Sequence, residues 1–295
     1  MRKTFPAVNP DAVRLDGVRA PYPPAPGVLV ALQDCATGAL RETPQSAREV
    51  QLLASRAFSV SPGRVYAAPG GKVLELLCRT LFFACRTVSS PSVRSRGAVA
   101  LCSPDPDTGA VLEKEEVAEL CSAGGSTVLV DERLRLEESG LTELLPEHEN
   151  LVLLRSIGFT HGLLGVNIAF ALCSRERVQA LIAQGGGPDR PALRAAAAAF
   201  LEEEYAGNVR ARLVESRESL RRSLEELGFA CPPTPGVFLP ARHARARPAR
   251  LRNELSRRGI EIALPAGEQG GIKLFLGTEP EHTALLYALK DILRA

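Results

Sequence analysis

The chain has 295 residues and a formal net charge of +2, with 36 basic and 34 acidic side chains interspersed along it. This balance gives no sign of a nucleic-acid groove or of a membrane-facing surface. The 45% of apolar residues can bury one large core or two modest ones.

The N-terminal residues lack the apolar run of a secretion signal, and no apolar run is long enough to cross a bilayer. The seven cysteines are odd in number and form no CxxC pair, so we expect free thiols and neither a disulfide framework nor a metal site. We therefore expect a cytoplasmic protein. The arginine-rich residues 240–258 are expected to form a solvated loop and helix face rather than a nucleic-acid site.

The first predicted elements are an arm and helices. The proline-rich stretch "RAPYPPAPG" favours an extended arm, and a helix is predicted directly after it. A second helix is predicted over residues 46–58, where Ser46 and Glu49 have the spacing of a capping box. Residues 65–85 predict a turn that leads into a buried amphipathic helix.

Four short β-rich runs follow, and helical patterns separate the earlier ones. This alternation is typical of an α/β layer with a largely parallel sheet. The runs are residues 97–102, 126–131, 150–156 and 165–172.

The C-terminal part has a different pattern. From Ser174 the chain is predominantly helical, and after Gly228 short strands and helices predict a small α+β unit. We therefore expect an arm with the first helix at 1–45, a shortened large α/β domain at 46–205 and a small C-terminal α+β domain at 206–295.

Five stretches occur in the order that one enzyme family uses. They are "RLDGVRAPYPPAPGVLVAL", "SPDPDTGAVLEKEEV", "VLVDERL", "LRSIGFTHGLLGVNIAFAL" and "GIKLFLGTEPEHTALLYAL". Over nearly its whole length the chain thereby resembles the fold-type I pyridoxal-phosphate enzymes, most closely the histidinol-phosphate aminotransferase and threonine-phosphate decarboxylase branch. The resemblance implies a mostly parallel sheet sandwiched by helices, a transferase ancestry and a dimer with its sites at the subunit interface.

The family's cofactor-binding residues are largely replaced in this chain. The lysine that forms the Schiff base falls on Phe159, and the phosphate-pairing arginine falls on Asn167. The arginine that clamps the substrate carboxylate becomes Lys273, which keeps the charge but not the bidentate fork. Other family side chains fall on Ala20, Thr43, Pro106, Leu134, Gly158 and Gly236. The interval 86–96 is also too short for the strand, helix and ring-stacking aromatic of the family.

Two features of that site remain. Asp131 falls where the family's aspartate pairs with the pyridine nitrogen. Gly70 and Gly71 precede a helix N-terminus, which favours an anion, and Lys72 adds a positive charge there. Each feature also has an ordinary structural interpretation. A strand-end carboxylate can cap a helix or pair with an arginine, and glycine turns are common.

The correlated losses predict a degenerate aminotransferase-like protein, a pseudoenzyme without a cofactor. Its old cleft would bind a small anion, through Lys72 and Lys273, or a partner protein. It would form a homodimer or a heterodimer with an active relative.

Two other interpretations stay open at this point. One is an active enzyme, either pyridoxal-phosphate-dependent through a relocated Lys72 or Lys273, or cofactor-independent with Lys72, Asp131 and His161 as candidate catalytic residues. The other is a purely structural assembly subunit.

Overall fold

A computed structural model describes residues 12–37, 46–81, 86–87, 98–124, 126–266 and 270–294. Its main sheet has six strands in the order β2-β7-β6-β5-β4-β3. Strands β3 to β6 run parallel, and β7 runs antiparallel to both of its neighbours. The strands are β2 (Val65–Ala68), β3 (Arg86–Thr87), β4 (Ala98–Cys102), β5 (Thr127–Asp131), β6 (Leu151–Arg155) and β7 (Ala169–Leu172). The largely parallel sheet is confirmed.

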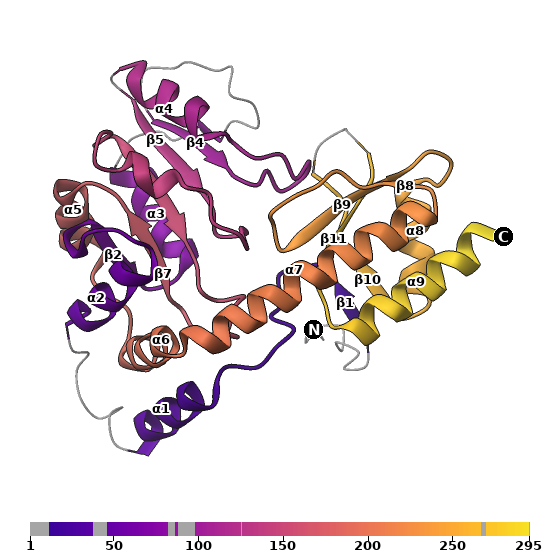
Figure 1. The fold of residues 1–295 in the computed structure, drawn as a ribbon, viewed down its shortest axis with the longest axis horizontal. Coiled ribbons are helices and arrows are strands. Elements are labelled where there is room, and N and C mark those ends of the chain that lie inside the picture. The colour runs from indigo at the N-terminus through magenta and orange to yellow at the C-terminus, as the bar shows by residue number, and fades with distance from the viewer. Residues whose placement is uncertain are drawn as a thin grey trace, which may run out of the picture.

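Helices cover both faces of this sheet (Figure 1). On β6, Leu151 and Leu153 belong to one core while Val152 and Leu154 belong to the other, because successive strand side chains point to opposite faces. The first core includes residues of α1 (Pro26–Thr37), α2 (Arg48–Ala57), α4 (Lys114–Ser122) and α6 (Arg190–Leu201). The second includes residues of α3 (Gly71–Leu81) and α5 (Arg175–Gly185). Burial on both faces explains why β6 and β7 contain no polar alternation.

The C-terminal part has its own core and is reached through the long helix α7 (Glu203–Glu226) (Figure 1). Its antiparallel sheet is β8 (Phe229–Ala230), β9 (Phe238–His243) and β11 (Ile272–Phe275). The other elements are α8 (Pro248–Ser256), β10 (Ile260–Ile262) and α9 (Glu279–Arg294), with short 3-10 turns at Pro62–Arg64 and Leu141–Leu144 in the large part.

The N-terminal arm contributes a strand to this C-terminal part. Strand β1 (Val13–Leu15) pairs in parallel with β10, with Val13 opposite Ile260. The two ends of the sequence therefore meet in one unit, a pairing that local sequence pattern does not show. The division at residues 45 and 205 stays a prediction.

Three local predictions need comment. The capping box at Ser46 is wrong: α2 begins at Arg48, Ala47 is its N-cap, and the Ser46 hydroxyl accepts a hydrogen bond from the Arg48 N–H at 3.2 Å. The capping box that the structure contains is Glu113 with Glu116, at the start of α4. The shortened interval 86–96 and Thr43 lie mostly or wholly outside the described residues.

Among the described residues, no helix is long and apolar enough to cross a membrane.

Candidate functional site

One cavity, which we call the α3 cavity, lies between the end of β5 and the start of α3. Its volume is about 360 Å³. The residues that matter for its chemistry are Gly70, Gly71, Asp131, Arg133, Ser156 and Asn167. Three family positions from the sequence, Gly70, Gly71 and Asp131, are therefore brought together.

The turn into α3 explains why glycines stand there. Gly70 has φ +95°, a backbone conformation that favours glycine, and its N–H donates to the Ala68 carbonyl oxygen at 2.8 Å. A Cβ on Gly71 would lie 2.5 Å from the Nη1 atom of Arg133. The first N–H groups of α3 have no acceptor within the helix, so this turn presents donors and the positive end of the helix dipole.

Arg133 crosses the α3 cavity, and sequence reasoning missed it. Its Nε donates to the two carboxylate oxygens of Asp131 at 2.9 and 3.1 Å, and its Nη1 donates to the Gly71 carbonyl oxygen at 2.8 Å. Burial lowers the pKa of Arg133, but hydrogen bonds and the charge of Asp131 outweigh burial and raise it above its ordinary value. Asp131 therefore pairs with an arginine, which is the ordinary structural role that the sequence also allowed for this strand-end carboxylate.

The position that the resemblance assigns to the lysine is part of a hydrophobic core. Phe159 is 6% exposed and clusters with Leu136, Leu213 and Phe238, while Leu134 and Tyr22 pack against that cluster. Gly158 and Ser156, not Phe159, line the α3 cavity. The old lysine side of the cleft is thus filled with apolar side chains from the arm, the loop after β5 and α7.

The two candidate lysines lie apart from the cavity. The Lys72 side chain is 93% exposed and its Nζ lies 3.8 Å from Glu75. The Nζ of Lys273, on β11, lies 3.4 Å from Asp107 and 5.8 Å from the ring centroid of Phe275. No lysine in the described part of the chain lines the α3 cavity. The predicted pairing of Lys72 with Lys273 around one anion is therefore not seen.

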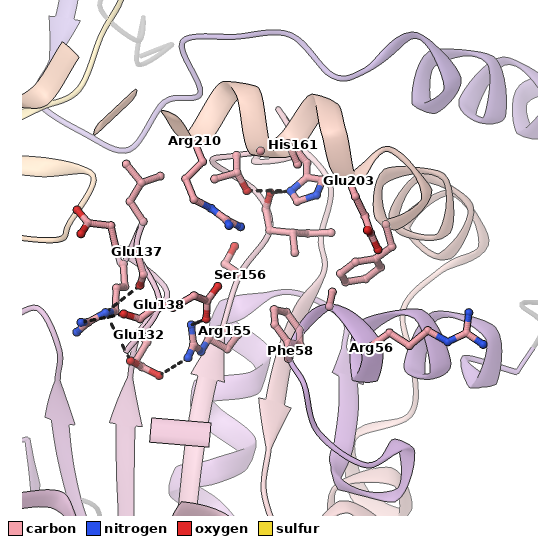
Figure 2. Close-up of a pocket in the computed structure, with 18 residues that line it drawn as sticks. Arg56, Phe58, Glu132, Glu137, Glu138, Arg155, Ser156, His161, Glu203 and Arg210 are labelled. Carbon is pink, nitrogen blue, oxygen red and sulfur yellow. Dashed lines mark hydrogen bonds and ion pairs between the residues drawn. The ribbon is translucent and has the colours of Figure 1, made fainter. Parts of the chain in front are cut away.

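A second cavity, which we call the Arg155 cavity, is lined by the loops that follow β5 and β6 and by the start of α7 (Figure 2). Its volume is about 320 Å³. Glu132 and Arg155 form its base, with the Arg155 Nη2 atom 3.0 Å from a Glu132 carboxylate oxygen. Burial raises the pKa of Glu132, against the opposing charge of Arg155.

His161 belongs to this second cavity, so grouping it with Asp131 and Lys72 was wrong. Its Nδ1 donates to the Ile157 carbonyl oxygen at 3.1 Å and lies 2.8 Å from the Thr160 hydroxyl. Burial lowers the pKa of His161 to about 4, which leaves the ring neutral at pH 7. His282 is also buried, and its Nε2 accepts the Gly277 N–H at 2.9 Å.

Consecutive residues of the segment "VDERL" line different cavities. Asp131 and Arg133 line the α3 cavity, whereas Glu132 lines the Arg155 cavity. Strand β5 ends at Asp131, and the Arg135 N–H donates to the Glu132 carbonyl oxygen at 2.9 Å in a turn, so no periodic pattern in the sequence located Arg133 and Glu132.

A parallel sheet with a carboxylate at the end of a central strand, facing a glycine turn and a helix N-terminus, is the architecture of the aminotransferase fold. The solved structures agree. Histidinol-phosphate aminotransferase from Sinorhizobium meliloti, in complex with pyridoxal-5'-phosphate, matches with TM-score 0.81 and 21% identity over 96% of this chain and 91% of that one. The enzyme from Clostridium acetobutylicum matches with TM-score 0.84 and 14% identity over 95% and 99%.

Sequence comparison places the chain in a family. The model of the aminotransferase class I and II family matches residues 84–281, which is more than half of the chain. Histidinol-phosphate aminotransferase 1 of Trichormus variabilis is 25% identical over 96% of this chain and 92% of its own length, and that of Bordetella parapertussis is 24% identical over 96% and 93%. The chain belongs to the aminotransferase class I and II family.

These comparisons correct one prediction. The expected absence of a cofactor is contradicted, because relatives over the whole length are aminotransferases and one structural neighbour was solved with pyridoxal-5'-phosphate bound. That prediction depended on the correlated replacement of several cofactor-binding residues, and the comparisons contradict it.

Proposed function

We propose that this chain is an enzyme of the aminotransferase family that binds pyridoxal phosphate in the α3 cavity and acts on a small amino compound. The observation that carries the proposal is the joint presence of Asp131 and the Gly70–Gly71 turn on one cavity wall. The names of the relatives, which are histidinol-phosphate aminotransferases, support a substrate that carries an amino group and a phosphate.

The residues of the cavity fit the two polar ends of this cofactor. The first amides of α3 would hold the phosphate, since helix N-termini bind anions. Asp131 would accept a hydrogen bond from the ring nitrogen, provided that Arg133 turns away from it. Arg133 would then face the phosphate and replace the arginine whose family position is Asn167.

A covalent link needs a lysine, and Lys72 is the best placed. It directly follows the two glycines of the cavity wall. Its side chain is exposed, and its Nζ lies 3.8 Å from the Glu75 carboxylate. Lys273 lies on β11, and its Nζ is 3.4 Å from Asp107, in the loop after β4. A primary amine on a flexible stem could swing over the cavity mouth without rearranging the core.

These positions assign a role to each residue of the proposed site. The cofactor supplies the electron-withdrawing ring that stabilises a carbanion. Asp131 orients that ring, and Arg133 with the α3 amides neutralises the phosphate. Leu134, which packs against the apolar cluster around Phe159, forms an apolar part of the cavity wall.

The test is titration of the purified chain with pyridoxal phosphate, followed by borohydride reduction and peptide mapping. We expect a cofactor absorbance band and a reduced adduct on Lys72, which Lys72→Ala abolishes. Lys273→Ala and the exposed Lys290→Ala serve as matched controls and keep the adduct. A chain with neither absorbance band nor adduct would overturn the proposal, and an adduct on Lys273 would overturn the role of Lys72.

A further inference from the structure

The Arg155 cavity has a polar end whose hydrogen-bonding capacity is not used. The Glu132 side chain is fully buried and that of Arg155 is 9% exposed. Among the described residues, the Nε atoms of Arg155 and Arg210 have no hydrogen-bond partner, and neither carboxylate oxygen of Glu132 accepts a hydrogen bond of good geometry. Buried polar groups in folded proteins are normally paired, so this end is built to receive something.

Three arginines and three glutamates line this end, but they do not all pair with one another; the residues are Arg135, Arg155, Arg210, Glu132, Glu137 and Glu138. Glu137 is already engaged by Arg217, and the Glu138 carboxylate lies 3.8 Å from Arg155. Arg210 reaches into the cavity from α7, opposite Arg155 (Figure 2), and no described carboxylate lies within ion-pair distance of it. A cationic site for an anion therefore stands beside the buried carboxylate of Glu132.

The other end of the cavity is apolar and aromatic. The rings of Phe58 and Phe200 meet edge to face at 6.0 Å between centroids, and the neutral ring of His161 lies 6.2 Å from that of Phe200. Phe58, Phe200 and His161 all line the cavity. This end offers contact surface to an apolar group, and the charged residues Arg56 and Glu203 line the cavity beside it (Figure 2).

We propose that the Arg155 cavity binds a free α-amino acid with an apolar side chain, at a site separate from the α3 cavity. The ligand carboxylate would meet Arg210 and Arg155, its ammonium group would meet Glu132, and its side chain would lie against Phe58 and Phe200. A volume of about 320 Å³ suits one molecule of this size and is at the lower end of ligand pockets.

The charges that line the cavity favour an amino acid over a ligand with a single charge. A bare anion such as phosphate would pair with Arg210 but would leave Glu132 with only its contacts to Arg155 and Arg135, at 3.0 and 4.0 Å. A simple amine would add a donor to Glu132 but leave Arg210 without an anion. A molecule that carries both charges on one carbon atom supplies an anion to Arg210 and a further donor to Glu132.

The test is isothermal titration of the full chain with L-phenylalanine, in parallel with hydrocinnamate, which lacks the amine, and phenethylamine, which lacks the carboxylate. We expect L-phenylalanine to bind at least about tenfold more tightly than either analogue, since each lost charge-assisted contact weakens binding by that order. Arg210→Ala should weaken L-phenylalanine binding to a similar extent. Arg212→Ala, an exposed arginine on the same helix, should not change it.

Variants of the two cavities distinguish this proposal from the proposed function. Asp131→Asn and Arg133→Ala should leave L-phenylalanine binding unchanged, because both side chains face the α3 cavity. Absence of binding, equal binding of hydrocinnamate, or insensitivity to Arg210→Ala would overturn the proposal. Loss of binding in the α3-cavity variants alone would also overturn it, because the amino acid would then occupy that cavity. Pyridoxal phosphate titration of Arg210→Ala tests the other cavity independently.

Discussion

Asp131 and Arg133 form an ion pair inside the α3 cavity, with the Arg133 Nε atom 2.9 Å from one carboxylate oxygen and the Nη1 atom 2.8 Å from the Gly71 carbonyl oxygen. The guanidinium group thereby joins the end of β5 to the first turn of α3. In the proposed function, this arginine has to exchange one anion for another: it leaves the Asp131 carboxylate and faces the cofactor phosphate.

Substitutions of Asp131 and of Arg133 should differ in their effects on the binding of the cofactor ring and of the phosphate. Arg133→Ala removes the cation, so we expect weaker binding of both inorganic phosphate and pyridoxal phosphate. Asp131→Asn removes the carboxylate that would pair with the ring nitrogen and also frees Arg133 to face an anion. Pyridoxal phosphate should then bind at least about tenfold more weakly while phosphate binding is retained. Isothermal titration with both ligands measures this difference. Equal effects of Asp131→Asn on the two ligands would show that Asp131 does not contact the ring.

Gly71→Ala should disturb the cavity through Arg133. The added Cβ would lie 2.5 Å from the Arg133 Nη1 atom, so the guanidinium group must shift away from the α3 N-terminus. We expect phosphate binding to weaken as in Arg133→Ala, with little change in the free energy of unfolding, since only the end of a flexible side chain has to move. Gly187→Ala, where a Cβ meets nothing within 4 Å, is the matched control. Unchanged phosphate binding in Gly71→Ala would argue against an Arg133 role in anion binding.

Phe159→Ala should destabilise the protein strongly. Phe159 is 6% exposed in the apolar cluster between the loop after β6 and α7. Truncation of a buried phenylalanine lowers the free energy of unfolding by about 3–5 kcal/mol, from lost apolar contact and the cavity left behind. Urea denaturation measures it, and Leu201→Ala, at a side chain that is 72% exposed, should change it far less. A small effect at Phe159 would mean that its side chain is not packed in this core.

His161 should make stability depend on pH below neutrality. Burial lowers the pKa of His161 from its ordinary value of 6.5 to about 4 in the folded chain. As the pH falls through that interval the unfolded chain takes up the proton first, so the free energy of the unfolded state falls and the folded state loses relative stability. The contribution is complete above pH 6.5 and amounts to up to about 3 kcal/mol lost by pH 4.

The measurement is urea denaturation of the wild type and of His161→Leu between pH 4 and pH 7. The loss of unfolding free energy on acidification should be smaller in His161→Leu, because one proton-binding difference between the two states is removed. Phe58→Leu, a neutral substitution in the same cavity, should lower stability without changing the pH dependence. Identical pH profiles for His161→Leu and the wild type would show that this histidine is not buried in the folded chain.

The sequence by itself determined the layered fold and part of one site. The apolar runs at 126–131 and 150–156 correspond to β5 and β6, because continuous β-rich stretches between helices are compatible only with strands covered on both faces. Asp131, Gly70 and Gly71 were correctly grouped, since a strand end and the turn before α3 occupy fixed places in this topology.

Only the tertiary structure decided which side chains meet across those places. Arg133 reaches Asp131 and the α3 N-terminus, while Glu132 and His161 face a different cavity, because the turn after β5 and the loop after β6 send neighbouring residues to opposite sides. The chain position of Phe159 likewise predicted a cleft residue, yet packing against α7 makes it core. Such contacts depend on segments far apart in the sequence, and a local pattern holds no information about the distance between them.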